Sequence, residues 1–338
     1  MDKQKRNRAV VLALLGIVGG IILFTLPQRK PQWREVNGVI WATTYSIKYQ
    51  HTDDLSDSIM SVFKIVDLSV SPFNKNSVVT AVNDNRSDSI DEIFSTIFAK
   101  SLVVYKETDG AFDPTLSPLI NAWGFGYKEG TLPSAARVDS ILQFVGLDKA
   151  HLKNGKINKD DSRISFNFSA IAKGFACDEI GRMFQRNGVS DFLIEVGGEV
   201  VAFGENQNGD KWHLSIDSPF ESRDTISHQS MKVIAVTDCG VATSGNYRNY
   251  QTDSVGAHFG HIIDPATGYP GKTDILSATV IADDCMTADA YATAFMVLGK
   301  SKSLEFLKNR DDIAALFVVG SDGFFKIVHT DNFPGYGK

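Results

Sequence analysis

Cysteine is scarce in this chain, with only Cys177, Cys239 and Cys285 among 338 residues. Their number is odd, their spacing is wide, and no CxxC pair occurs. The sequence therefore indicates neither a disulfide framework nor a zinc site. We expect the three residues to be buried thiols.

Excess positive charge and repetition are absent as well. The formal net charge is −6, and no basic stripe follows the N-terminus, which argues against a nucleic-acid-binding surface. We find no internal repeat and no low-complexity tract. What remains is ordinary globular composition, with 43% hydrophobic and 22% charged residues. The length suffices for one large or two ordinary domains with a sizeable core.

A long apolar run occurs at the N-terminus. Residues 9–26 are uncharged and follow four basic residues. As a helix they would span about 27 Å, near the roughly 30 Å of a bilayer core. No A-x-A-like cleavage site follows, and no cysteine is placed for lipidation. We predict that residues 1–30 form an uncleaved anchor that leaves the rest outside the cytoplasm, with a cleaved signal peptide as the alternative.

Helical and strand patterns are mixed through the rest of the chain. The predicted helices are 53–68, 87–106, 134–144, 170–187 and 287–298. The predicted strands include 38–49, 193–196, 200–203, 316–319 and 324–328. The stretch 69–86 is polar and rich in turn residues. Strands and helices alternate too irregularly for a doubly wound fold, so we predict an α+β fold with a mostly antiparallel or mixed sheet.

Asp289 and Thr293 are the first candidate site residues. They lie one helical turn apart, so their oxygen atoms share a face. Mg²⁺ takes few protein ligands and shares the rest with water and phosphate, which suits such a pair. The alternative is a helix start, with Thr287 as N-cap and Asp289 near the positive helix end. The rest of this helix is small or apolar, and a buried carboxylate needs a partner, which favours the metal ligand.

Two further segments offer groups for an anion. Lys173 falls in the first turn of the predicted helix 170–187, where a cation is unfavourable unless an anion binds. A solvated lysine is the alternative. Thr243 and Ser244 precede a glycine, and such loops wrap phosphate oxygens, although many turns share this composition.

His261 and Asp113 both stand beside turns. His261 precedes two isoleucines and the turn at 264–268, which suggests the mouth of a site. Substrate binding or proton transfer is one interpretation of His261, and a structural histidine is the other. Asp113 precedes a proline, which holds its backbone extended. A site residue is one interpretation of Asp113, and an ordinary turn carboxylate is the other.

Six motifs in order identify a family. They are Gly110-Ala-Phe-Asp-Pro-Thr115 with Trp123-Gly-Phe-Gly126, Ala170-Ile-Ala-Lys-Gly174, Glu195-Val-Gly-Gly198, Thr243-Ser-Gly245, His261-Ile-Ile-Asp-Pro265 with Gly268-Tyr-Pro270, and Ala288-Asp-Ala290 with Thr293. Together they resemble the FAD:protein FMN transferase family, also called the ApbE family, over nearly all of the chain after the N-terminal run. The resemblance implies an ApbE-like mixed sheet with packed helices, and one large FAD-binding FMN transferase unit at residues 38–335.

The resemblance also implies an activity. Family members transfer the FMN half of FAD to a threonine or serine hydroxyl of an acceptor protein, release AMP and use Mg²⁺. It further implies a membrane electron-transport subunit as acceptor, and an inner-membrane location with the catalytic unit on the periplasmic side. Two alternatives stay open, namely a FAD pyrophosphatase that gives FMN and AMP, and a membrane-anchored flavin-binding protein without catalysis.

Site residues follow from the resemblance by position. Asp289 and Thr293 would bind the metal through their side chains, with Ala170 nearby, and His261 is the candidate base. The residues at FAD-contact positions are Trp41, Phe73, Ala111, Phe112, Asp113, Asn167, Lys173, Thr243, Ser244 and Ile263. Asn167 stands where an aspartate is common, and Trp41-Ala-Thr43 replaces the usual Met-Gly-Thr. Asn83 falls where we expect the family to vary between transfer and hydrolysis.

Overall fold

The computed structural model describes residues 30–127, 132–217, 230–245, 250–252, 258–271, 273–321 and 324–335. An eight-stranded sheet runs in the order β1-β2-β5-β6-β9-β12-β13-β14, and each neighbouring pair is antiparallel. Its strands are β1 Gln32–Ile40, β2 Thr43–His51, β5 Phe192–Val196, β6 Glu199–Phe203, β9 Cys239–Gly245, β12 Ile275–Ala282, β13 Ile313–Ser321 and β14 Phe324–His329. The predicted α+β fold is confirmed.

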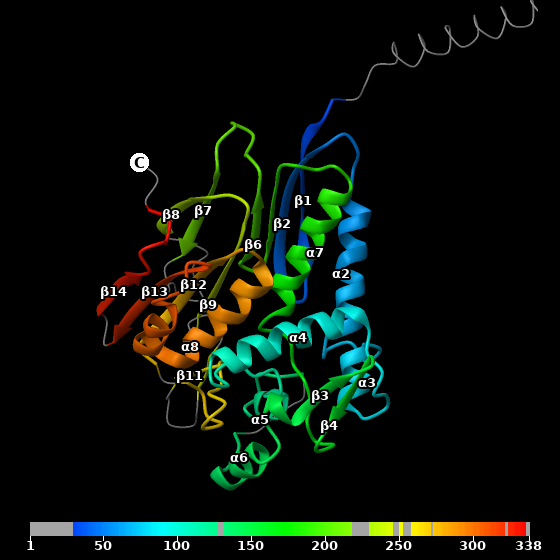
Figure 1. The fold of residues 1–338 in the computed structure, drawn as a ribbon, viewed down its shortest axis with the longest axis vertical. Coiled ribbons are helices and arrows are strands. Elements are labelled where there is room, and N and C mark those ends of the chain that lie inside the picture. Colours follow the sequence, from blue (N-terminus) through cyan, green and yellow to red (C-terminus); the bar gives the residue numbers. More distant parts are fainter. Residues whose placement is uncertain are drawn as a thin grey trace, which may run out of the picture.

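Helices cover one face of this sheet. The helices are α2 Ser56–Val70, α3 Val78–Asn83, α4 Glu92–Glu107, α5 Ser117–Ala122, α6 Ala135–Leu142, α7 Ala172–Arg186 and α8 Cys285–Leu307. In Figure 1, α7 and α8 lie across the sheet, and α4 separates it from a lower group containing α3, α5, α6 and the ribbon of β3 Ala150–Lys153 and β4 Lys156–Lys159. Two further ribbons pair β7 Trp212–Asp217 with β8 Ser230–Val236, and β10 Tyr250–Thr252 with β11 His258–Gly260.

Strand β13 shows how the sequence builds two cores. Because side chains alternate across a strand, Ala315, Phe317 and Val319 enter the large core under the helices. The intervening residues of β13 enter a smaller core against Trp212 and Ile234 of the β7–β8 ribbon. The central sheet is therefore buried on both faces, which gives the loops at its ends a rigid base.

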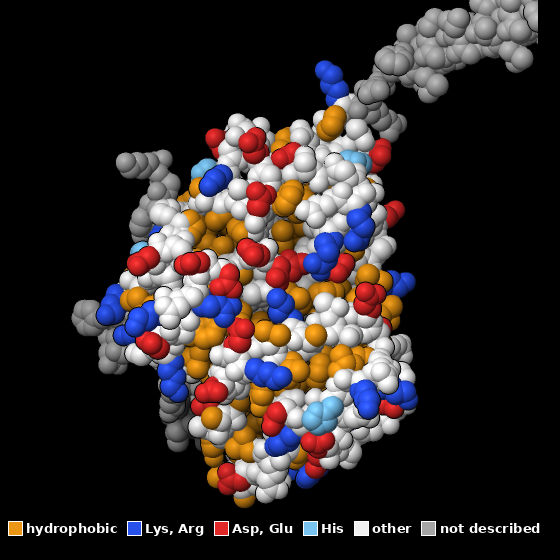
Figure 2. All heavy atoms as spheres, in the orientation of Figure 1, with side chains coloured by type: hydrophobic (Ala, Val, Ile, Leu, Met, Phe, Trp, Pro, Cys, Tyr) orange, Lys and Arg blue, Asp and Glu red, His pale blue; other side chains and the backbone are white. Residues whose placement is uncertain are grey.

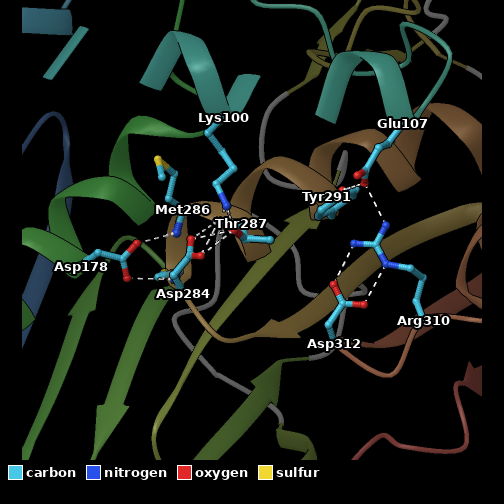
Figure 3. Close-up of polar contacts among 10 residues, drawn as sticks. Lys100, Glu107, Asp178, Asp284, Met286, Thr287, Tyr291, Arg310 and Asp312 are labelled. Atoms are coloured by element: carbon cyan, nitrogen blue, oxygen red, sulfur yellow. Dashed lines mark hydrogen bonds and ion pairs between the residues drawn. The ribbon is translucent and has the colours of Figure 1, made fainter. Parts of the chain in front are cut away.

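The first turns of α8 are fixed by polar contacts from other helices. Asp284 is the N-cap and accepts a hydrogen bond from the Thr287 amide. From α7, Asp178 accepts hydrogen bonds from the amides of Cys285 and Met286, each at 2.9 Å (Figure 3). From α4, Lys100 donates to the Thr287 hydroxyl. The predicted helix start near residue 287 is thus corrected to Cys285, because Asp284 supplies the cap.

The middle of α8 is held in the same way. Tyr291 donates a hydrogen bond to Glu107 at the end of α4 (Figure 3). Arg310 donates to the same carboxylate at 2.8 Å, and it pairs with Asp312 as well. Two separate clusters therefore fix the helix that carries Asp289 and Thr293.

Several predicted boundaries were wrong for identifiable reasons. The predicted strand 38–49 is the hairpin of β1 and β2, because Trp41 and Ala42 adopt positive φ angles of 49° and 59° in a two-residue turn. The turn-rich stretch 69–86 contains α3, which Ser77 caps by accepting from the Thr80 amide. Gly299, where a helix end was predicted, does interrupt α8 with φ 74°, but the helix resumes beyond it.

The predicted anchor segment 9–26 lies outside the described residues. Within the described ranges, no helix combines the length and the apolar character that crossing a membrane requires. On the face shown in Figure 2, acidic and basic side chains of the described residues are interspersed.

Backbone contact joins α7 to α8 at Gly174. A Cβ atom there would lie 2.4 Å from the carbonyl oxygen of Cys285. From the sheet side, a Cβ on Gly240 of β9 would lie 2.2 Å from the Cys285 amide nitrogen. Both separations are far below van der Waals contact, so glycine is required for α8 to start between α7 and β9.

We predict that Gly174→Ala lowers the free energy of unfolding by about 1–3 kcal/mol, because the new methyl group forces α7 and α8 apart. The matched control is Gly181→Ala on the same helix, where the added Cβ would meet the Phe192 ring at 3.4 Å. This control should be neutral or stabilising by up to about 1 kcal/mol. Urea denaturation of the purified proteins measures both values, and equal values for the two variants would contradict the argument.

Candidate functional site

A cavity of about 640 Å³ lies where the α7 start, the α8 face and several strand ends meet. This volume falls within the roughly 300–1,000 Å³ typical of small-molecule sites. Each residue predicted for the site lines the cavity: Trp41, Phe73, Ala111, Phe112, Asp113, Asn167, Ala170, Lys173, Thr243, Ser244, His261, Ile263, Asp289 and Thr293. The fold therefore gathers residues that are up to 252 positions apart, from Trp41 to Thr293, around one space.

Oxygen atoms from α8 and β9 line one part of the cavity. Asp289 and Thr293 lie one turn apart on α8, as predicted. The Thr293 hydroxyl lies 3.1 Å from the Ser244 hydroxyl, within hydrogen-bonding distance. Behind Ser244, Thr243 and Thr279 share a hydrogen bond of 2.9 Å between neighbouring strands. The register of β9 and β12 places Thr243 directly opposite Thr279, on the face of β9 that Ser244 does not share.

Asp289 has the features of a ligand for a hard cation. It is 3% exposed, and its Oδ2 accepts a hydrogen bond from the Gly174 amide at 3.1 Å. No described residue donates a hydrogen bond to Oδ1, although the residue lines the cavity. Among the described residues, no group of three or more His, Cys, Asp or Glu side chains could hold a metal. The buried Asp289 carboxylate, with one uncommitted oxygen and the Thr293 hydroxyl one turn away, fits Mg²⁺, which needs few protein ligands when phosphate and water supply the rest.

Lys173 and Glu199 form an ion pair beside Asp289. Lys173 donates a hydrogen bond to Glu199, whose side chain is 4% exposed, whereas Lys173 is 30% exposed and lines the cavity. Burial lowers the pKa of Lys173, but Glu199 and Asp289 outweigh burial and hold that pKa above its usual value. As noted from the sequence, a cation in the first turn of a helix is unfavourable without a nearby anion. In the structure, the carboxylates of Glu199 and Asp289 provide the negative charge.

When both carboxylates are ionised, they carry one more negative charge than Lys173 balances. Burial raises the pKa of Glu199, and Asp289 adds to the rise although Lys173 opposes it. Burial likewise raises the pKa of Asp289, against the effects of Lys173 and the Gly174 amide. A cation bound at Asp289 would supply the missing positive charge, so this part of the cavity suits a metal together with anionic oxygens.

Asp113 sits at a different part of the cavity. It is 8% exposed and accepts hydrogen bonds from the amide and the hydroxyl of Thr115, at 2.8 and 2.6 Å. The Thr115 hydroxyl oxygen also accepts from the Gly146 amide. Burial raises the pKa of Asp113 to about 6, although the bonds from Thr115 oppose this shift. Asp113 therefore stabilises a turn, as the alternative interpretation expected, and it does so at a buried position on the cavity wall.

His261 lies on the cavity wall beside Phe125, with ring centroids 6.3 Å apart. The turn that follows docks on the lower group of helices, because Trp123 donates to the Gly268 carbonyl at 2.8 Å. A Cβ on Gly268 would lie 2.6 Å from Val138 of α6. These contacts explain why His261 reaches the cavity, and they assign it no chemical role.

Aromatic side chains form another wall. Phe73 is 66% exposed, and its ring centroid lies 6.1 Å from that of Tyr127. Trp41 donates a hydrogen bond from Nε1 to Asp67 at 3.1 Å. Since the indole is fixed by this bond, it offers a rigid flat surface to a ring system.

Asn83 and Asn167 have structural hydrogen bonds, and some lining residues were not predicted. Asn83 does not line the cavity, because its amide bonds to the backbone N–H and carbonyl of Phe166. Asn167 accepts from the Ser169 amide, which shapes the turn into α7. Glu199 and Asp217 line the cavity but were not predicted. Glu199 directly follows the Glu195-Val-Gly-Gly198 motif, which was the available signal; Asp217 reaches the site only through the fold of β7.

Comparisons with known proteins agree with this geometry. Residues 41–317 match the model of the ApbE family. The chain is 30% identical to the FAD:protein FMN transferase of Vibrio cholerae serotype O1, over 98% of this chain and 99% of the relative. It is 30% identical to the enzyme of that name from Escherichia coli K12, over 88% and 86%. The solved structure of the flavin transferase ApbE from Vibrio cholerae superimposes with a TM-score of 0.80 at 28% identity, covering 90% of this chain and 98% of that one.

We predict a pH-dependent effect of Asp113→Asn on stability. The pKa of Asp113 rises from 3.8 to about 6 on folding, so its contribution to stability is full below about pH 4 and is lost as pH rises through 6. The difference in unfolding free energy, wild type minus variant, should fall by about 3 kcal/mol across this window. Urea denaturation at intervals from pH 4 to 7 measures it, with the exposed Asp109→Asn as control. A constant difference would contradict the prediction.

Proposed function

The chain belongs to the ApbE family, and from this premise we propose that it transfers FMN from FAD to a threonine or serine hydroxyl of an acceptor protein. Mg²⁺ is the proposed metal and AMP the proposed second product. The observation that carries the proposal is one cavity that joins a metal-type oxygen pair, a lysine fixed by an ion pair and an aromatic wall. FAD needs these three environments, because it contains a pyrophosphate between two ring systems.

The proposed binding mode assigns each part of FAD to one part of the cavity. The pyrophosphate lies between Lys173 and the oxygen atoms of Asp289 and Thr293. The flavin contacts Trp41 and Phe73. The adenine lies toward the segment Ala111, Phe112 and Asp113, while Asn167, Thr243, Ser244 and Ile263 complete the contacts. Support comes from the shared lining of these residues and from the chemistry of each group.

The proposed reaction is a displacement at the phosphorus on the FMN side. The acceptor hydroxyl oxygen forms a new bond to this phosphorus, and the bond to the bridging oxygen breaks. The electron pair of that bond leaves with AMP. The hydroxyl proton passes to a base, for which we assign His261 because it lines the same cavity.

The protein's own groups stabilise the charge that this displacement shifts. Lys173, held in place by Glu199, neutralises phosphoryl oxygens without having to reorganise. Asp289 and Thr293, with Ala170 beside them, would hold Mg²⁺, which when bound supplies further positive charge at the pyrophosphate. The buried position of Asp289 strengthens each of these interactions, because little water screens them.

We also propose the location and the partner. Residues 1–30 anchor the chain in the inner membrane, with the transferase unit 38–335 on the periplasmic side. The support is the basic start followed by the apolar run 9–26. A membrane electron-transport subunit as acceptor would then share the same membrane, which raises the encounter rate.

The decisive experiment incubates the protein with FAD, Mg²⁺ and a candidate acceptor, and weighs the acceptor by mass spectrometry. We expect a mass gain equal to FMN on one threonine or serine, with one AMP released for each transfer. A parallel sample without acceptor measures hydrolysis. Rapid AMP release in that sample, with no gain on any acceptor, would favour the FAD pyrophosphatase. Bound FAD without AMP in either sample would favour a flavin-binding protein.

We predict that Asp289→Asn lowers the transfer rate by about 10²–10³-fold, because among the proposed ligands Asp289 is the one that brings a negative charge to the metal. Calorimetric titration with Mg²⁺ in the presence of FAD should show correspondingly weaker metal binding. The control is Asp283→Asn, which neutralises an exposed carboxylate just before α8. Undiminished transfer by Asp289→Asn at saturating Mg²⁺ would refute the metal assignment.

A further inference from the structure

A second cavity, of about 510 Å³, adjoins the first. Its walls come from the β1–β2 turn, the end of α2 with the loop after it, and the start of α7. It shares Trp41, Phe73, Ser169 and Lys173 with the first cavity. Lys173 therefore borders both spaces, and a group in the second cavity lies next to the proposed position of the pyrophosphate.

The walls of the second cavity have few uncommitted polar groups. Asp67 accepts hydrogen bonds on both oxygens, from Trp41 at 3.1 Å and from Asn74 at 2.6 Å. The side-chain oxygen of Asn74 accepts a hydrogen bond from the Asn76 backbone amide. The remaining surface includes Val70 and Ala172. Such a lining suits small apolar side chains and offers little to a charged or strongly polar ligand.

An aromatic side chain is also exposed at the edge of this cavity. Phe73, which borders it, is 66% exposed. Exposed aromatic side chains are enriched at surfaces that another protein covers. The cavity and its rim together therefore have the character of a protein-binding surface.

We propose that the second cavity binds the acceptor protein, as an extended segment whose threonine or serine is flanked by small apolar residues. The proposal rests on the function proposed above, which requires an acceptor hydroxyl to approach the phosphorus beside Lys173. If FAD fills the first cavity, the second is an open space that also reaches Lys173. Apolar flanking side chains occupy the Val70 and Ala172 walls and direct the hydroxyl toward Lys173.

The test narrows the second cavity without touching the first. Ala172→Leu and, independently, Ser71→Leu add bulk at residues that border only the second cavity. The control is Ala99→Leu, at an exposed position of α4 away from both cavities. The probes are two synthetic peptides of equal length with one central threonine, flanked by alanine and valine in one and by aspartate in the other. FMN transfer is followed by mass spectrometry, FAD affinity by flavin fluorescence, and hydrolysis by AMP release without peptide.

We expect the wild type to modify the apolar peptide in preference to the acidic one. Each cavity variant should raise the KM for that peptide about tenfold or more, with the FAD affinity and the AMP release unchanged. The Ala99→Leu control should match the wild type in all three measurements.

Three results would overturn the proposal. Weaker FAD binding by both cavity variants would show that FAD itself occupies the second cavity. An unchanged KM, or a preference for the acidic peptide, would show that the acceptor docks elsewhere. Hydrolysis of FAD by the wild type without transfer to either peptide or to any protein acceptor would remove the proposed transferase function as well, which distinguishes that failure from the other two.

Discussion

The contact between α7 and α8 at Gly174 is the constraint on which the site depends. Because no side chain separates the two backbones there, the Gly174 amide reaches the carboxylate of Asp289. The preceding residue, Lys173, is thereby held beside the same carboxylate. Gly240 lets β9 approach α8 equally closely, which brings Ser244 to Thr293. A wider spacing at either glycine would move apart the Lys173 ammonium, the Asp289 carboxylate and the hydroxyls of Ser244 and Thr293. These groups together suit a pyrophosphate and its metal.

Close packing of these elements also buries charge, and the fold compensates for it. Two buried carboxylates lie beside one partly exposed lysine, and burying a carboxylate is unfavourable unless it is paired. Glu199 and Asp289 share Lys173, so when both carboxyls are ionised one negative charge is left for an incoming cation. Helix α8, which carries Asp289, is held by contacts outside the cavity, with Asp178, Lys100 and Glu107. Stability and ligand binding are therefore assigned to different residues of the same helix, which lets the site keep an incompletely balanced charge.

The two adjoining cavities give the proposed reaction a spatial order. FAD in the first cavity would present its pyrophosphate at Lys173, and an acceptor in the second would approach the same lysine from the other side. Trp41 and Phe73 stand on the boundary between the two spaces. Trp41 lies in a two-residue turn with positive φ, and its indole is fixed by Asp67. The β1–β2 turn is thus a rigid part of the boundary between the two substrates.

The sequence alone determined what depends on local pattern. The spacing of Asp289 and Thr293, the position of Lys173 in a first helical turn and the α+β class follow from periodicity and capping, which are properties of neighbouring residues. The ordered motifs added the family. Only the tertiary structure decided which residues from distant segments meet. Glu199 of β6 pairs with Lys173 because α7 packs against that strand. Asn83 is bonded to the Phe166 backbone and therefore lies outside the cavity. A local sequence pattern does not reveal such contacts, because they arise when separate helices and strands pack together. The distance between two residues along the chain does not tell whether they meet in space.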